Sequence, residues 1–587
     1  MCPFLRRVAV RSGGVRRQVS FWVFAMLIAG LLVWALSPTV GFAFVDWDDR
    51  HYIVESIFTR NPFAAGLKNF LTTPWYGYPI PLVSLSWAVD ARLSEGEAWS
   101  FHLTNLLLHL GNTALVFGVA RGWGRTTQAS DPDTAPERLI AAALVAGLWA
   151  LHPVVAEPAS WCIGRKDLLC TGAALLSVLG SRLAVAQPGA GWRWLRWLAF
   201  AAALGSKPTG VVVPLLWLLD SRVRSESFDR SLLREVAAAL VVSLGFAVGS
   251  FSLLGDAGGL SSTTPLDRLL FATRHLALQA EHYLLPLSLA PRYFMATAGA
   301  SALVAAVAGA ALWLAPAFAV WRRGWSELSG GLFWLALCFL PVAGFIGMNR
   351  GPADSYFYLP SVGLWLAALP LLRRIALRAS GRLAAMVLLC VLASALRWQS
   401  GIWADSESLW RRQVEVAPEV ATSWWSLADV YAASGRPREA VAVYEYALKV
   451  VAPPLSPAPY LEMSRGCLLA SDRACATHWL TVAETAFPGR IDVALRRVGL
   501  DLLGGATLAT ADREGVVSGW LRTLLPCGLE ADYGLVDDDA AALAALRASA
   551  GAGEGDLVTR PRARALLDFG LSRMQHRSGA PVPPLPL

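Results

Sequence analysis

Long apolar runs, separated by short polar segments, follow one another through the first two thirds of the chain. A helix that spans a bilayer needs about 20 mostly apolar residues. The runs predict about eleven membrane spans, at roughly 19–41, 102–120, 138–156, 167–186, 193–206, 209–221, 232–254, 300–320, 329–347, 358–372 and 382–398. Charged residues and histidines interrupt the apolar face of 267–290, so we expect an interfacial helix there rather than a span.

The pattern changes after residue 399, where long apolar runs stop and charged residues become more frequent. Residues 421–454 predict a helical hairpin, because small and aromatic residues stand at the spacing of a tetratricopeptide (TPR) unit. These residues are Trp424, Leu427, Ala428, Tyr431, Ala440, Tyr444 and Ala447. A weaker copy follows, and 403–416 resembles half a unit. We therefore expect a short TPR-like α-solenoid.

The predicted fold class is all-α: a polytopic membrane helix bundle followed by the solenoid. The predicted domains are a transmembrane domain, the TPR-like repeats, an additional irregular helical region and a Pro-rich tail, at 1–398, 399–490, 491–572 and 573–587. Cys467 and Cys475 fall near each other in the second hairpin. They are expected to form either a disulfide or two free thiols.

Composition excludes several classes of protein. Hydrophobic residues make up 55% of the chain and charged residues only 16%, whereas soluble proteins carry about 25% charged residues. A soluble enzyme, a disordered protein and a coiled coil are therefore excluded. The net charge of +8 comes from arginines scattered between apolar runs, and not from one soluble basic face, so we expect no nucleic-acid partner.

Arginine placement predicts the orientation in the membrane. If the N-terminus is cytoplasmic, the arginine clusters between the predicted spans all fall on the cytoplasmic side, provided that 267–290 does not cross. Residues after 399 would then lie outside the cytoplasm. The alternative is that the first apolar segment is a cleaved signal peptide.

Polar residues gather in the loops predicted for the outer face. Because polar groups are costly in or beside a membrane, their presence there indicates a function. They are Asp46, Asp48 and Asp49; His152, Glu157, Arg165, Lys166 and Asp167; Lys207; and Arg350, Asp354, Tyr356 and Tyr358. Cations at a membrane rim suit a lipid phosphate, and a carboxylate beside them suits a general base. The set predicts group transfer from a lipid-phosphate carrier to an acceptor outside the cytoplasm.

Simpler interpretations remain open at this stage. Residues 165–167 could form a loop ion pair, and the paired aspartates could be a helix cap or a solvated turn. Two adjacent aspartates supply too few ligands for a divalent metal, so a metal is possible but not predicted, and no tightly bound cofactor is expected. Interhelical hydrogen bonds are the expected role of four polar residues on one face of the second span, namely His102, Asn105, His109 and Asn112.

Several motifs together resemble one family. They are FVDWDDRHYI, PLVSLSWAVDARL, FHLTNLLLHLGNTALVF, LHPVVAEPASWCIGRKDLL, SKPTGVVVPLLWLLD, YFYLPSVG and WADSESLWRRQVEVAP. In this order, over roughly residues 40–450, the chain resembles the transmembrane and tetratricopeptide-repeat O-mannosyltransferases, membrane glycosyltransferases of the GT-C class, and in particular their bacterial relatives.

The resemblance implies inverting transfer of a monosaccharide from a polyprenyl phosphate to a protein hydroxyl. It implies Asp48 or Asp49 as the catalytic base, without separating them. Arg165, Lys166 and Lys207 would bind the donor phosphate, helped by Tyr358 and Arg350. His152, Glu157, Asp167 and Tyr356 would shape the site or contact the acceptor. The chain departs from the family at Ser355, where relatives carry an arginine, and this puts one phosphate contact in doubt.

The sequence thus predicts a multi-pass enzyme of the cytoplasmic (inner) membrane, with a cytoplasmic N-terminus and an extracytoplasmic TPR-like region that recruits the acceptor protein. Two alternatives stay open. The acceptor could be a lipid, glycan or cell-wall polymer, or the chain could be a non-catalytic membrane-anchored TPR scaffold.

Overall fold

A computed structural model gives the structure of the chain. It describes residues 21–488, with gaps at 64–65, 74–77, 125–135, 188, 227, 255–263, 296–298, 346–350, 452–453 and 455, and also Val493 and Leu500. Apart from these last two residues, the predicted irregular region 491–572 and the tail 573–587 lie outside the described residues. The chain divides into two compact units, Met1–Ala417 and Pro418–Leu587.

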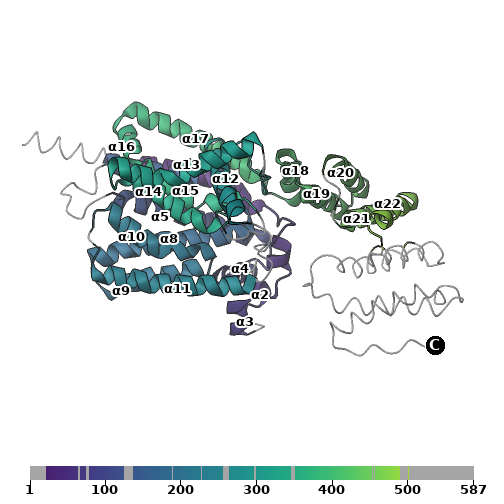
Figure 1. Ribbon diagram of the computed structural model, residues 1–587, viewed down its shortest axis with the longest axis horizontal. Helices are drawn as coiled ribbons and strands as arrows, with labels where there is room; N and C mark the ends of the chain where they lie inside the picture. Colours follow the sequence, from purple (N-terminus) through teal and green to yellow (C-terminus); the bar gives the residue numbers. More distant parts are fainter. Residues whose placement is uncertain are drawn as a thin grey trace, which may run out of the picture. The chain divides into compact units, whose positions relative to one another are not determined.

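The first unit is an all-helical bundle (Figure 1). It opens with the helical segment Phe21–Gly41. The helices that follow are η2 (Arg50–Val54), α2 (Ile57–Arg60), α3 (Leu67–Thr72), α4 (Pro81–Leu93), α5 (Ala98–Gly122), α6 (Pro136–Ala150), η3 (Pro153–Val155), α7 (Ala156–Ser160), α8 (Arg165–Ala186), α9 (Ala190–Leu204), η5 (Pro208–Val212), α10 (Val213–Val223), α11 (Arg230–Leu254), α12 (Pro265–Leu284), α13 (Ala300–Arg323), α14 (Glu327–Phe339), η9 (Asp354–Phe357), α15 (Pro360–Ala367), α16 (Leu369–Leu377), α17 (Ala379–Gly401) and α18 (Ser406–Val416).

Six helices in the described part of the chain are long and apolar enough to cross a membrane, or eight if two bent helix pairs each count as one span. The chain therefore has the helices of a membrane protein, but the predicted count of eleven is not reached. The difference lies in short helices. α9 has 15 residues, α10 has 11 and α14 has 13, each below the length that one crossing requires.

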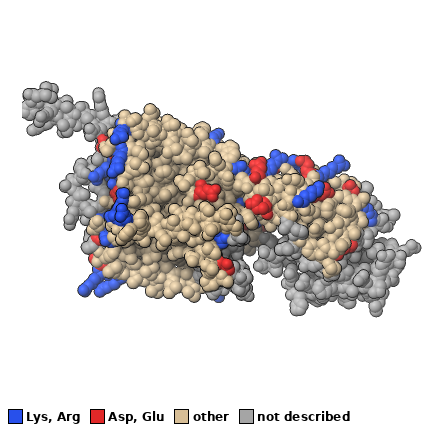
Figure 2. Space-filling model, turned by 45° about the horizontal axis from the view of Figure 1, so that its top comes forward, with Lys and Arg blue, Asp and Glu red and all other residues tan. Residues whose placement is uncertain are grey.

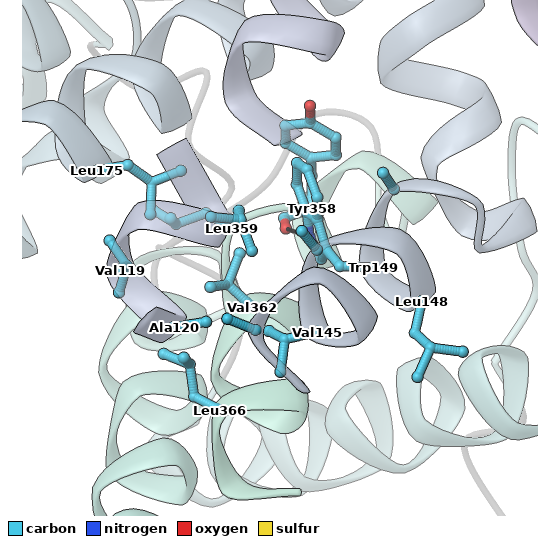
Figure 3. Packing of buried hydrophobic residues seen from close by; sticks show 14 of the residues in the cluster. Val119, Ala120, Val145, Leu148, Trp149, Leu175, Tyr358, Leu359, Val362 and Leu366 are labelled. Carbon is cyan, nitrogen blue, oxygen red and sulfur yellow. Dashed lines mark hydrogen bonds between the residues drawn. The ribbon is translucent and has the colours of Figure 1, made fainter. Parts of the chain in front are cut away.

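Part of the core of the first unit, with side chains from α5, α6, α8, α15 and the segment leading into α15, is drawn in Figure 3. Trp149 of α6 lies against Tyr358 with ring centroids 4.8 Å apart, and its indole nitrogen donates to the Tyr358 carbonyl at 3.0 Å. α14 and α15 approach closely at Gly331 and Gly363, where a β-carbon on either residue would overlap the backbone of the other helix. Glycine is required at both positions for this contact.

Positive charge gathers at one end of the first unit, as Figure 2 shows. Arginines occupy the last turns of α10, α13 and α16. α8 and α10 both run from the polar loops described below towards arginines near their C-terminal ends, Arg182 and Arg222. The polar loops and these arginines therefore lie at opposite ends of the same helices.

The second unit contains two helix pairs in its described part, α19 (Ala421–Ala433) with α20 (Pro437–Val450) and α21 (Ala458–Leu469) with α22 (Arg473–Ala486). The small and aromatic residues that predict the first hairpin are largely buried between its helices, including Ala428, Tyr444 and Ala447. A disulfide joins Cys467 and Cys475 across the second pair. The assignment of these pairs to TPR units stays a prediction.

Candidate active site

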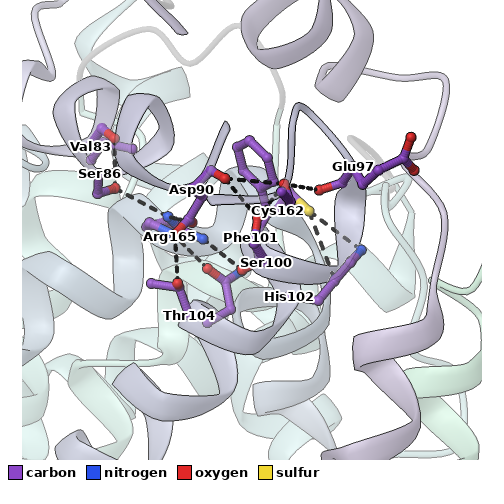
Figure 4. Close-up of polar contacts among 12 residues, drawn as sticks. Val83, Ser86, Asp90, Glu97, Ser100, Phe101, His102, Thr104, Cys162 and Arg165 are labelled. Atoms are coloured by element: carbon purple, nitrogen blue, oxygen red, sulfur yellow. Dashed lines mark hydrogen bonds and ion pairs between the residues drawn. The ribbon is translucent and has the colours of Figure 1, made fainter. Parts of the chain in front are cut away.

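Arg165, one of the predicted phosphate ligands, is fully buried at the start of α8 (Figure 4). It forms an ion pair with Asp90 of α4. Its Nε donates to Asn105 Oδ1 at 2.8 Å, and one Nη donates to the Phe101 carbonyl at 2.6 Å. A buried charge is tolerated only when it is paired and hydrogen-bonded, and Arg165 satisfies this condition entirely inside the protein. The predicted contact of Arg165 with a phosphate does not fit this geometry.

Through these contacts Arg165 joins α4, α5 and α8. Sequence reasoning missed its partner, although Asp90 stands inside one of the motifs quoted above. The available signal was the lone carboxylate in the mainly apolar motif PLVSLSWAVDARL.

Lys166 and Asp167 follow Arg165 in the first turn of α8, and each points in a different direction because successive helical residues are rotated by about 100°. The Lys166 ammonium lies over the Trp161 ring, 5.1 Å from its centroid. Asp167 instead accepts a hydrogen bond from Lys207 Nζ at 2.5 Å. The start of α8 thus presents a cation and a carboxylate to different neighbours.

Lys207 lies in the loop between α9 and η5 and is buried. Its ammonium lies over the Tyr356 ring, 4.9 Å from the centroid. Burial alone would lower the pKa of Lys207, but the charge of Asp167 opposes this effect and the pKa is raised. Lys207 is therefore a cation at neutral pH.

A small cavity opens beside this pair. It is lined by residues of α8, of Lys207 and η5, of α14 and the turn after it, and of the η9–α15 segment. These residues are Asp167, Cys170, Thr171, Lys207, Thr209, Cys338, Val342, Ser355, Tyr356, Leu359 and Pro360. Three predicted site residues, Asp167, Lys207 and Tyr356, share this lining. Ser355, the departure from the family pattern, is in the same wall.

The two candidate bases differ in environment. Asp48 is half-buried, whereas Asp49 is buried and its Oδ2 accepts a hydrogen bond from the Val45 amide at 3.0 Å. Burial raises the pKa of Asp49 from 3.8 to about 8, and the hydrogen bond from Val45 offsets only part of the shift. A carboxyl group with a pKa near neutral pH is suited to accepting a proton. The structure therefore distinguishes two residues that the sequence left equivalent.

Tryptophan packing brings the Asp49 loop to the start of α8. Trp47 stacks on Trp161 with ring centroids 5.0 Å apart, and Lys166 lies over the same Trp161 ring. Tyr78, missed by sequence reasoning, lies near the cavity residues Tyr356 and Asp167. Its pKa is raised by removal from water and, less strongly, by the nearby acidic groups of Tyr356 and Asp167.

Two other predicted residues belong to the scaffold. The hydroxyl of Tyr358 is buried and hydrogen-bonded to His109 Nδ1 at 2.6 Å and to Asn112, so a contact with the donor phosphate does not fit. His152 Nε2 lies 2.8 Å from the Tyr283 carbonyl, and the two rings stack at 3.8 Å. Both side chains hold helices together, and the expected interhelical hydrogen bonds of the second predicted span are confirmed for His109, Asn105 and Asn112.

A second polar cluster surrounds Asp354 of η9. Tyr293 donates its hydroxyl proton to the Asp354 carboxylate, at 2.7 Å, and His282 Nδ1 lies 3.5 Å from the same carboxylate. Glu157 of α7 is buried and influences Tyr293 electrostatically. Tyr293 and His282 were missed, because no motif marked them. Arg350 lies outside the described residues.

In the part of the chain that is described, no three His, Cys, Asp or Glu residues are grouped so that they could hold a metal ion. The described side chains offer acid–base and electrostatic chemistry. Asp49 is a carboxyl group with a raised pKa, Lys166 lies over Trp161, and Lys207 lies beside the cavity.

Comparison with known proteins points to one group. The chain is 32% identical over 220 residues to the protein O-mannosyl-transferase Tmtc2 of Drosophila melanogaster, which covers 34% of this chain and 22% of the relative. It is 39% identical over 105 residues to human protein O-mannosyl-transferase TMTC4 (17% and 14%), and 27% identical over 428 residues to mouse TMTC4 (62% and 57%).

This protein is similar to the protein O-mannosyl-transferases of the TMTC group. The matches span less than two thirds of the length of these relatives. No protein-family model and no solved structure matches the chain.

Proposed function

We propose that this protein is a membrane glycosyltransferase that moves a monosaccharide from a polyprenyl phosphate to a serine or threonine hydroxyl of a protein. The carrying observation is the burial of Lys207 beside Asp167 at a cavity, together with Lys166 over the Trp161 ring and Asp49 in the loop whose Trp47 stacks on Trp161. Similarity to proteins named O-mannosyl-transferases supports the same activity.

In this proposal the reaction is an inverting displacement. Asp49 takes the proton of the acceptor hydroxyl, and the oxygen forms a bond to the anomeric carbon. The bond between that carbon and the phosphate oxygen breaks, and its electron pair leaves with the polyprenyl phosphate. Lys166 and Lys207 neutralise the charge of the departing phosphate. Asp167 and Tyr356 hold Lys207 in place.

The proposal includes a GT-C-like bundle of the cytoplasmic membrane, with the arginine-rich end in the cytoplasm and the site on the other side. The separation of the arginines from the site along α8 and α10 supports this orientation. The second unit would then lie outside the cytoplasm, where disulfides persist, in agreement with the Cys467–Cys475 bond. Its helix pairs would recruit the acceptor polypeptide.

The test uses the full chain reconstituted in liposomes with a radiolabelled polyprenyl-phosphate mannose and a Ser/Thr-containing peptide. Lys207→Ala should reduce transfer by at least about 100-fold, comparable to the loss of one group that stabilises a developing charge. Lys449→Ala is the matched control, because Lys449 is an exposed lysine on α20. Wild-type transfer by the Lys207 variant would refute the proposed site, and label found only in lipid or glycan would refute the protein acceptor.

A further inference from the structure

α18 follows the last predicted span, and the sequence assigns it to the repeat region. Its contacts instead place it in the first unit, which ends at Ala417. The helix is capped by Asp405, whose carboxylate accepts from the Ser408 amide at 2.8 Å. One face of α18, formed by Leu409, Trp410 and Gln413, is buried. A solvent-facing half-repeat does not explain this burial.

The first partner of this region is the loop that carries Asp49. The amide of Ala43 donates to the Ala404 carbonyl at 3.0 Å. The amide of Asp46 donates to Ser406 Oγ at 2.6 Å, and the Asp46 carbonyl accepts from Trp410 Nε1 at 3.4 Å. Both backbone polar groups of Asp46 are therefore held by α18.

This contact bears directly on Asp49, because the carboxylate of Asp49 is itself held by the amide of Val45, the residue before Asp46. Trp410 also packs on Trp47, with ring centroids 5.5 Å apart. A displacement of Asp46 would move both the Val45 amide and the Trp47 ring, and with them the carboxylate.

The second partner is the loop between α12 and α13. Gln413 accepts from the Arg292 amide at 2.7 Å and donates to the Arg292 carbonyl at 3.0 Å. Arg412 donates to the Leu287 carbonyl at 2.7 Å. The Arg292 guanidinium in turn lies over Trp47, 5.3 Å from the ring centroid. α18 thus joins two loops, that of Asp46 and that of Arg292, which are about 250 residues apart in sequence. The two loops also contact each other directly, through Arg292 and Trp47.

We propose that Ser406, Trp410 and Gln413 are positioning residues, which hold the Asp49 loop and the Arg292 loop in the geometry that the transfer reaction requires. The inference rests on the proposed function and extends it to α18, which the sequence assigns to the repeat region. A helix that only completes the fold would stabilise the protein without setting the rate of the chemical step. A positioning helix sets kcat, because small displacements of a reacting group slow catalysis strongly.

The experiment uses the full chain in liposomes with Ser406→Ala, Gln413→Leu and the conservative Ser406→Thr. Arg411→Ala is the control, since Arg411 pairs with Glu407 on the exposed side of the same helix. Two readouts are measured: hydrogen–deuterium exchange of residues 43–54, and kcat and KM for transfer to the peptide. Ser406→Ala and Gln413→Leu should lower kcat by about 10-fold or more with KM unchanged.

Exchange in residues 43–54 should accelerate in Ser406→Ala and should be close to the wild-type rate in Ser406→Thr. In Arg411→Ala it should stay at the wild-type rate. The values of kcat should follow the same order. Unchanged exchange in Ser406→Ala would overturn the proposal, and so would faster exchange with an unchanged kcat. If the wild-type chain were inactive, the proposed function would fail, whereas the exchange measurement would still decide whether α18 holds the loop.

Discussion

Replacing Asp49 and Asp48 separately by asparagine tests the assignment of the base. Asparagine has the size of aspartate but cannot accept the proton. Because burial raises the pKa of Asp49 to about 8, the folded protein favours the neutral form of this side chain, and Asp49→Asn should fold as well as the wild type. Its transfer rate should fall by about 10²–10⁴-fold, the usual contribution of a general base.

The wild-type pH profile follows from the same pKa. A base acts only in its deprotonated form, so activity should be lost as the pH falls through about 8. The deprotonated fraction is ~10% at one pH unit below that value and ~1% at two units below it, which gives a slope of about tenfold per pH unit.

The assay is transfer of labelled sugar to a peptide in liposomes, measured between pH 6 and pH 9.5. Asp48→Asn is the matched control, and it should keep both the rate, within a few-fold, and the profile of the wild type. The reasoning is refuted if Asp48→Asn abolishes transfer while Asp49→Asn retains it, or if the wild-type rate is constant below pH 8.

Three further predictions concern residues of the scaffold. Arg165→Gln should destabilise the protein by about 3–5 kcal/mol, because it leaves Asp90 buried and unpaired; the double variant with Asp90→Asn should recover much of this loss, and equal thermal unfolding of the single and double variants would contradict the pairing. Tyr358→Phe should cost about 1–2 kcal/mol through the lost hydroxyl hydrogen bonds while leaving kcat unchanged in the transfer assay, and a large fall in kcat would return Tyr358 to the site. Cys467→Ser should lower the stability of the second unit by about 2–3 kcal/mol, measured by thermal unfolding with and without reductant; the variant should match the reduced wild type, and a difference between them would argue against a bond to Cys475.

The sequence predicted the helical membrane architecture and three residues that the structure brings together at the cavity, for a clear reason. Apolar runs and charged motifs are local features, which can be recognised from neighbouring residues without knowledge of the fold. Lys207 is the best example: it is one of four lysines in the chain, and it is buried beside a cavity together with the predicted Asp167 and Tyr356.

The sequence could not show environments that depend on a distant partner. Arg165 and Lys166 are neighbours in one motif, but only the structure shows that Asp90 neutralises Arg165 whereas Lys166 lies over a tryptophan. Asp48 and Asp49 could not be separated because their burial is decided by packing around Trp161. The count of eleven spans stays a prediction, because it includes the short runs 193–206 and 209–221, whose helices α9 and α10 have only 15 and 11 residues.

The hydrogen bond between Lys207 and Asp167 has a consequence for how tightly a donor can be held. A phosphate that reaches the Lys207 ammonium competes with the Asp167 carboxylate. The net attraction between the phosphate and Lys207 is therefore smaller than it would be for an unpaired lysine. The same carboxylate is in place to recapture the lysine as the spent carrier departs. In the proposed reaction, the pair would therefore favour release of the product.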